Sequence, residues 1–244
     1  LRGLVGSEMC IRDRYFDGCS WTKGIELENM EDERYSKLIC NELGAEESNF
    51  GRGGGSNDRI IRNLMTENDI EKYDLAIIQM TFPARTEYLK AARFVEDQWI
   101  KISPKWNYSD WLYNKSEKEY SLMGDKGLEN GATKHILSTM PNLGDHKFDY
   151  WTKADGHAKF WRHYYTSVAN RKYFDVKENI QLQTIRNHCK AHDVPLILCT
   201  INTWSKLKFD YVMKVKGEAR AERGHPNKLG HERIASDILS IWKR

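Results

Sequence analysis

Ser20 lies in a short turn, GCSWTKG, at the end of a strand predicted over residues 15–18. A serine hydroxyl is a weak nucleophile at neutral pH, and it becomes effective when a base takes its proton and nearby N–H groups stabilise an oxyanion. The turn would place Ser20 at the carboxyl end of a strand, where open α/β sheets bind their ligands. Taken alone, a serine between a strand and a helix is more often a helix N-cap. Catalysis therefore requires a partner elsewhere in the chain.

A candidate partner lies near the end of the chain, in the segment ERGHPNKLGH. His225 precedes the last predicted helix, in a loop that Pro226 and Gly230 would constrain. A neutral imidazole at this point could take the proton from Ser20 and return it to a leaving group. Glu222, three residues earlier, could orient the ring. Considered singly, His225 is a loop residue bonded to backbone and Glu222 a solvated charge, so the argument depends on their combination.

The order of these segments resembles the SGNH/GDSL hydrolase family. Three blocks carry the resemblance: GCS at residues 18–20 for G-D-S, with Cys19 in place of Asp; Asn49, Gly51 and Gly54 for N-x-G-x-x-G; and ERGHPN for D-x-x-H-P, with Glu222 in place of Asp. The resemblance implies that Ser20 is the nucleophile, His225 the base and Glu222 its acid. It also implies that the N–H groups of Ser20 and Gly54 form the oxyanion hole. It covers residues 15–89 and 175–244.

The family's G-x-N-D block has no counterpart in this chain. After the apolar run DLAIIQM comes TFPARTE, which has no Asn where the resemblance requires a side-chain oxyanion donor. Thr81, Arg85 or Asn57 could take its place. Because loss of one such donor typically lowers turnover by about 100- to 1,000-fold, this substitution bears directly on activity.

The hydrophobic pattern predicts an α/β fold, a three-layer α/β/α arrangement around a doubly wound parallel sheet of flavodoxin-like character. Continuous apolar runs at residues 74–80 and from Val194 are typical of strands that are covered on both faces. Helical spacing predicts a first helix that ends at Gly44, and a second helix after the glycine loop that Ser56 or Asn57 caps. It also predicts a helix through residues 180–189 and a closing helix over residues 228–242.

The sequence suggests one domain over residues 15–244. Residues 1–14 resemble a translated adapter sequence known from metagenomic reading frames, and we expect them to be a non-native leader. An insertion or lid at about residues 95–175 holds 15 of the 28 aromatic residues. We favour the core of an added helical subdomain as its explanation, ahead of a stacking platform for sugar rings.

Charge and composition exclude several classes of protein. The 38 basic and 35 acidic residues are interspersed, so nothing indicates binding to nucleic acid or to an anionic membrane. No apolar run approaches the ~20 residues of a membrane span. The five cysteines lack a C-x-x-C pair, which favours a reducing, cytoplasmic setting without disulfides. The glycine loop GRGGGSN does not match a P-loop, and the histidines lack the spacing of metal ligands, so we expect neither cofactor nor metal.

These observations predict a serine esterase that acts on a small-molecule or carbohydrate ester, either acyl or O-acetyl, through an acyl-enzyme intermediate. Two alternatives remain open: acyl transfer to a glycan or another hydroxyl acceptor, and a non-catalytic binding module that retains the SGNH fold. The oligomeric state is not predicted by the sequence.

Overall fold

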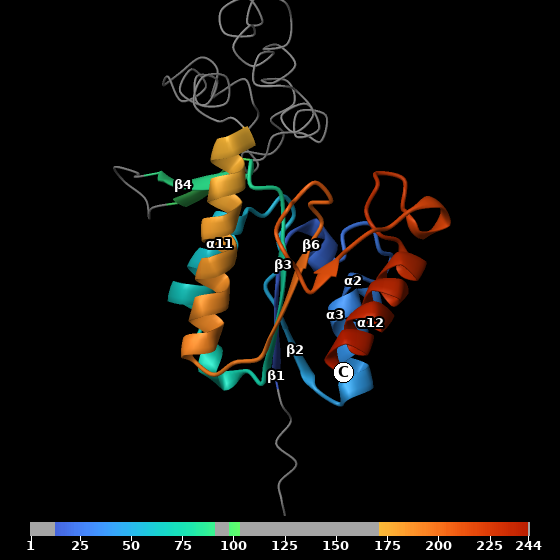
Figure 1. The fold of residues 1–244 in the computed structure, drawn as a ribbon. Helices are drawn as coiled ribbons and strands as arrows, with labels where there is room; N and C mark the ends of the chain where they lie inside the picture. Colours follow the sequence, from blue (N-terminus) through green and yellow to red (C-terminus); the bar gives the residue numbers. More distant parts are fainter. Residues whose placement is uncertain (1–12, 91–97, 103–170, 244) are drawn as a thin grey trace, which may run out of the picture.

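A sheet of five parallel strands forms the centre of the computed structural model, which describes residues 13–90, 98–102 and 171–243 (Figure 1). The strand order is β2-β1-β3-β6-β7, which confirms the predicted doubly wound, flavodoxin-like sheet. The strands are β1 (Asp13–Asp17), β2 (Glu46–Asn49), β3 (Leu75–Met80), β6 (Leu196–Thr200) and β7 (Tyr211–Val212).

Helices cover both faces of the sheet and complete the three layers (Figure 1). Helices α3 (Tyr35–Leu43) and α12 (Lys228–Trp242) pack together on one face, and α4 (Asn57–Arg62) and α11 (Arg171–Ala191) pack on the other. Shorter elements are α1 (Ser20–Lys23), α2 (Met30–Glu33), η1 (Asn63–Glu67), η2 (Ile70–Lys72) and η4 (Gly217–Ala219). The carboxyl ends of the strands remain free for the loops that carry the candidate site.

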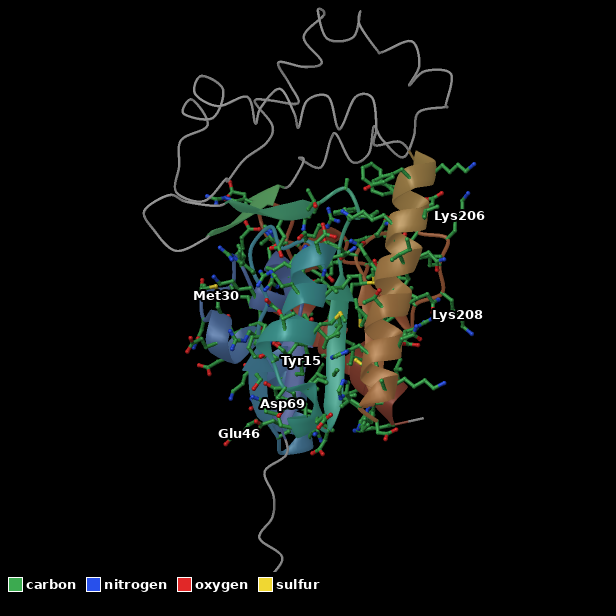
Figure 2. The ribbon with its side chains drawn as sticks, turned by 90° about the vertical axis from the view of Figure 1, so that its left-hand side faces the viewer. Tyr15, Met30, Glu46, Asp69, Lys206 and Lys208 are labelled. Carbon is green, nitrogen blue, oxygen red and sulfur yellow. The ribbon has the colours of Figure 1, made fainter. Side chains whose placement is uncertain are left out.

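The core divides into two clusters because successive strand residues point to opposite faces. On β3, Ile77 packs toward α3 and α12, whereas Ile78 packs toward α4 and α11. All six residues of β3 are buried, as the continuous apolar pattern predicts for a central parallel strand. Figure 2 shows Tyr15 inside the domain and Met30 at its surface, in agreement with their exposed fractions of 0% and 39%.

Several local predictions are confirmed. Helix α12 has the expected bounds, α3 ends before Gly44 at a left-handed φ of 60°, and the Ser56 hydroxyl caps α4 by accepting from the Arg59 N–H. Strand β1 begins at Asp13, two residues earlier than expected, because Asp13 and Arg14 pair with β2.

The expected leader and insertion lie mostly outside the described residues. At the start of the expected insertion, an antiparallel hairpin, β4 (Thr86–Lys90) with β5 (Gln98–Ile102), forms a separate two-stranded sheet. The sequence pattern did not predict this hairpin. In the described part of the chain, no helix combines the length and the apolar character that a membrane crossing needs.

Candidate active site

The turn after β1 holds Ser20 at the first position of α1. An added Cβ on Gly18 would lie 2.1 Å from Thr22 Oγ1 and 2.8 Å from Gln79 Oε1, so only glycine fits there. The Gln79 side chain, which comes from β3, accepts hydrogen bonds from the Cys19 N–H (3.3 Å) and the Thr22 hydroxyl (2.9 Å). The central strand thus fixes the turn, and Ser20 retains 7% exposure.

His225 lies against Ser20 although 205 residues separate them. Its Nε2 is 3.0 Å from the Ser20 hydroxyl oxygen. The loop between η4 and α12 brings the ring there, and it is held by a hydrogen bond from the Ala221 N–H to the His225 carbonyl (2.8 Å) and by a left-handed φ of 87° at Gly224. The structure therefore brings together the proposed nucleophile and base.

The other ring nitrogen of His225 contacts Glu26, a residue six positions after Ser20. The distance from His225 Nδ1 to Glu26 Oε2 is 2.5 Å. The same carboxylate accepts from the backbone N–H of His225 (3.2 Å) and of Arg223 (2.8 Å). Glu26 has a φ of 76°, which is uncommon for a residue with a side chain and is found where surrounding contacts compensate the strain. Three hydrogen bonds to one carboxylate supply that compensation.

The electrostatics of this contact determine which nitrogen of His225 carries the proton. Burial raises the pKa of the Glu26 carboxyl, but the donors of Arg223 and His225 outweigh burial, so the pKa lies below its usual value. The ionised carboxylate can only accept, and His225 Nδ1 must therefore be the donor. In the neutral imidazole, Nε2 then has a lone pair directed at the Ser20 hydroxyl.

Glu222 does not take the place that the resemblance gives it. Its side chain is exposed, because a tight turn closed by the Gly224 N–H on the Ala221 carbonyl (3.0 Å) directs residue 222 to solvent. The Glu26 carboxylate contacts Nδ1 of the His225 ring instead. The sequence carries no motif for Glu26, since it stands among several acidic residues of an irregular loop and its contact depends on the path of a distant loop.

The glycine loop lies beside the nucleophile turn. Asn49 joins the two, since its Nδ2 donates to the Thr22 carbonyl (2.9 Å) and its Oδ1 accepts from the Gly51 N–H (2.8 Å). Gly54 has a φ of 68° within a turn of this loop. In the described part of the chain, neither the Ser20 N–H nor the Gly54 N–H donates to another residue. Among the described residues, therefore, both N–H groups are without an acceptor.

The three candidate replacements for the missing asparagine differ in what their donors do. Asn57 Nδ2 donates to the Thr81 carbonyl (3.1 Å) and to Gln181 Oε1 (3.0 Å), and Asn57 Oδ1 accepts from the Thr81 N–H (2.7 Å). These hydrogen bonds already occupy the side-chain N–H groups of Asn57 and the backbone N–H of Thr81. Arg85 donates from Nη1 to the Thr81 hydroxyl (2.7 Å), and its buried Nε has no partner among the described residues.

Arg85 also affects the residue next to the nucleophile. Burial would raise the pKa of the Cys19 thiol, but the Arg85 guanidinium and N–H donors from Trp21 and Gln79 lower it below its usual value. A positive charge therefore acts on the turn that holds Ser20.

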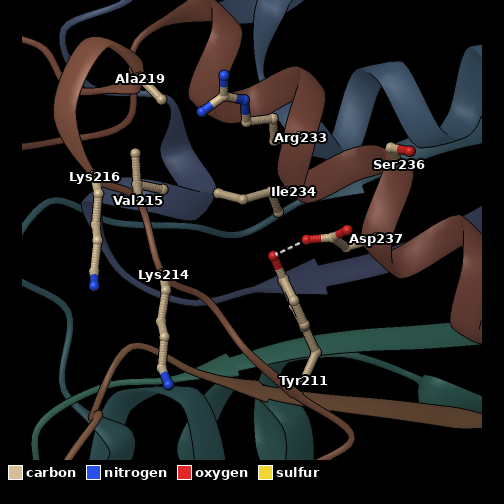
Figure 3. Close-up of a pocket in the computed structure, with 9 residues that line it drawn as sticks. All are labelled: Tyr211, Lys214, Val215, Lys216, Ala219, Arg233, Ile234, Ser236 and Asp237. Carbon is tan, nitrogen blue, oxygen red and sulfur yellow. Dashed lines mark hydrogen bonds between the residues drawn. The ribbon is translucent and has the colours of Figure 1, made fainter.

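A separate pocket of about 240 Å³ lies between β7 and α12 (Figure 3). Figure 3 shows the Tyr211 hydroxyl directed at Asp237, to which it donates at 2.5 Å. Ser20, Glu26 and His225 do not line this pocket. Across the described residues, no cluster of three or more His, Cys, Asp or Glu side chains is arranged to hold a metal ion.

No protein-family model matches the sequence, and no curated protein is significantly similar to it. Solved structures do match. A lipolytic protein of the G-D-S-L family from Desulfitobacterium hafniense is 12% identical over 94% of this chain and 98% of its own, with a TM-score of 0.36. The lipase/acylhydrolase from Enterococcus faecalis is 16% identical over 94% of both chains, with a TM-score of 0.37.

A two-domain esterase active on acetylated mannans is 12% identical over 95% of this chain and 49% of its own, with a TM-score of 0.38. Several matched structures are described as GDSL or SGNH hydrolases, the family that the sequence blocks indicate. Likeness at these scores carries no argument about activity, so the function has to be argued from the side chains of this chain.

Proposed function

We propose that this chain is a serine hydrolase that cleaves an ester through an acyl-enzyme intermediate. One observation carries the proposal: Glu26, His225 and Ser20 form a continuous series of contacts, 2.5 Å from carboxylate to Nδ1 and 3.0 Å from Nε2 to the hydroxyl. A nucleophile bonded to a base that a third group orients is the arrangement that activates serine.

In the acylation step, the Ser20 hydroxyl oxygen attacks the ester carbonyl carbon, and its proton moves to His225 Nε2. The Glu26 carboxylate balances the positive charge of the imidazolium. The carbonyl oxygen becomes an oxyanion, which accepts from the N–H groups of Ser20 and Gly54. When the bond to the alcohol breaks, Nε2 returns the proton to the leaving oxygen, and the acyl group remains on Ser20.

In the deacylation step, water replaces the alcohol. His225 Nε2 takes a proton from the water, whose oxygen attacks the acyl carbonyl, and the same N–H groups hold the second oxyanion. The bond to Ser20 then breaks and the hydroxyl recovers its proton. We propose Arg85 as the cationic group that supplements the two backbone donors, in place of the family's asparagine. Apart from the ester and water, these steps use side chains and backbone of this chain.

The substrate proposed for this site is an acyl or O-acetyl ester of a small molecule or a carbohydrate. A single substitution tests the chemistry. Ser20→Ala should abolish hydrolysis of p-nitrophenyl acetate and labelling by a fluorophosphonate, while the far-UV circular dichroism spectrum stays unchanged. Ser236→Ala is the matched control, because Ser236 is exposed on α12 at the separate pocket. Activity retained by Ser20→Ala would refute the proposal.

A further inference from the structure

A buried ion pair lies directly behind the nucleophile turn. Asp17, the last residue of β1, is fully buried and pairs with Arg59 of α4, whose side chain is 6% exposed. The Asp17 carboxylate also accepts from the Gly18 N–H (2.7 Å), from Asn63 Nδ2 (3.1 Å) and from the Tyr15 hydroxyl (3.2 Å). Every oxygen of this buried carboxylate is therefore engaged.

The pair connects the nucleophile turn to the glycine loop. Arg59 Nη2 donates both to Asp17 and to the Gly18 carbonyl, the latter at 2.9 Å. The Gly18 carbonyl accepts a second bond, from the Arg52 N–H of the glycine loop (3.2 Å). An added Cβ on Gly55 would lie 3.0 Å from the same carbonyl and 3.3 Å from Arg59 Nε. The turn, the loop and α4 meet at this one carbonyl.

A buried ion pair is weak evidence for a purely stabilising role, because desolvation of two charges offsets most of their attraction. What a charged and hydrogen-bonded pair supplies instead is a fixed geometry. Here that geometry sets the spacing between the turn that carries Ser20 and the loop that carries Gly54. Each contributes one N–H to the proposed oxyanion hole, and a displacement of either would separate the two donors.

We propose that Asp17 and Arg59 are positioning residues that fix the spacing between the Ser20 turn and the glycine loop, so that one N–H group from each can bind the oxyanion. The inference rests on the proposed serine hydrolase function. Neither residue touches the substrate or the reacting atoms, and both act through the Gly18 carbonyl and the backbone that follows it.

The pair also makes activity dependent on pH. Burial raises the pKa of Asp17 to about 6, against the opposing effects of Arg59, of the Gly18 N–H and of Asn63. The groups that face this carboxyl are Arg59 from α4, Asn63 from η1 and Tyr15 from β1. The pKa of Tyr15 is raised far above its usual value by burial and by Asp17, so Tyr15 stays neutral. Protonation of Asp17 in mild acid therefore removes the charge that holds Arg59.

The experiment compares the pH dependence of kcat for p-nitrophenyl acetate in the wild-type protein and in Asp17→Asn. In the wild-type protein the acid limb should include one proton bound by Asp17, so its slope on a logarithmic plot should be steeper by one than in Asp17→Asn. Asp17→Asn should lower kcat at pH 7.5 by at least tenfold and leave KM within twofold. Equal slopes in the two proteins, or a folded Asp17→Asn protein with wild-type kcat, would overturn the proposal.

A second variant covers the case in which Asp17→Asn does not fold because Arg59 is left without its counter-charge. Asp17→Asn combined with Arg59→Gln removes both charges and keeps two hydrogen-bonding side chains. A folded double variant with reduced kcat supports positioning, and one with wild-type kcat overturns it. Failure of the proposed function is distinguishable, because it appears as activity in Ser20→Ala, whereas failure of the positioning role leaves Ser20→Ala inactive.

Discussion

Replacement of Glu26 by glutamine tests the site most directly, because it changes one charge at almost constant volume. The Glu26 carboxylate accepts from His225 Nδ1, and in the proposed mechanism it faces an imidazolium. The two side chains are 13% and 23% exposed, so an effective dielectric constant of about 20 is appropriate, at which unit charges about 4 Å apart attract by about 4 kcal/mol. At about 1.4 kcal/mol per tenfold change, we expect kcat to fall by about 1,000-fold.

The amide adds a second effect, because its NH₂ group donates where the carboxylate accepts. If that NH₂ faces Nδ1, the ring carries its proton on Nε2 and has no lone pair for the Ser20 hydroxyl. Steady-state kinetics with p-nitrophenyl acetate, normalised by fluorophosphonate titration of active protein, measure the loss. Glu222→Gln is the matched control, and it should retain activity within about twofold because Glu222 is exposed. A 1,000-fold loss in Glu222→Gln together with near-normal kcat in Glu26→Gln would refute the assignment.

Three further predictions concern the surroundings of the site. Gly18→Ala should lose about 1–3 kcal/mol of unfolding free energy and most activity, because its Cβ would lie 2.1 Å from Thr22 Oγ1. An unchanged Tm in differential scanning calorimetry would contradict the close contact between residue 18 and Thr22. Arg85→Met should lower kcat by about 10- to 100-fold with little change in KM, and Arg85→Lys should recover part of the lost kcat. An unaffected kcat in Arg85→Met would mean that the two backbone N–H groups stabilise the oxyanion without Arg85. The raised pKa of Asp17, from 3.8 to about 6, favours the folded state below pH 3.8, and this contribution of about 3 kcal/mol is lost as pH rises through 6. Urea unfolding of the wild-type protein and of Asp17→Asn between pH 4 and pH 7 measures this contribution. The free energy of unfolding should fall more steeply with rising pH in the wild-type protein than in Asp17→Asn, and an equal pH dependence would contradict the prediction.

Elements with strong hydrophobic patterns were predictable from sequence, and weakly patterned ones were not. Strand β3 and helix α12 carry enough apolar residues to specify their type and bounds. Strand β7 has two residues and the hairpin β4–β5 stands outside the main sheet, so neither produces a periodic signal of useful length. The parallel arrangement of the sheet was predicted from the alternation of strands and helices, because parallel strands need crossover connections.

Within the site, the pairing of Ser20 with His225 was predicted because the GCS and HPN segments resemble blocks of the SGNH/GDSL family. The partner of His225 Nδ1 was not. The choice between Glu26 and Glu222 depends on a left-handed backbone at Glu26 and on the outward turn at residues 221–224, and local sequence specifies neither. The involvement of Asn57 with Thr81 and Gln181 likewise requires long-range packing between α4, β3 and α11.

Because Ser20 and Glu26 are only six residues apart, most of the proposed catalytic residues come from the N-terminal part of the chain. In the proposed mechanism, the N-terminal portion supplies the nucleophile, the acid and the glycine loop, and the C-terminal portion supplies the imidazole. Strand pairing between β3 and β6 joins these portions across the centre of the sheet. If the chain were expressed as two fragments divided between Lys90 and Arg171, neither would hydrolyse an ester. Turnover would then report their reassembly, as in a split-enzyme reporter.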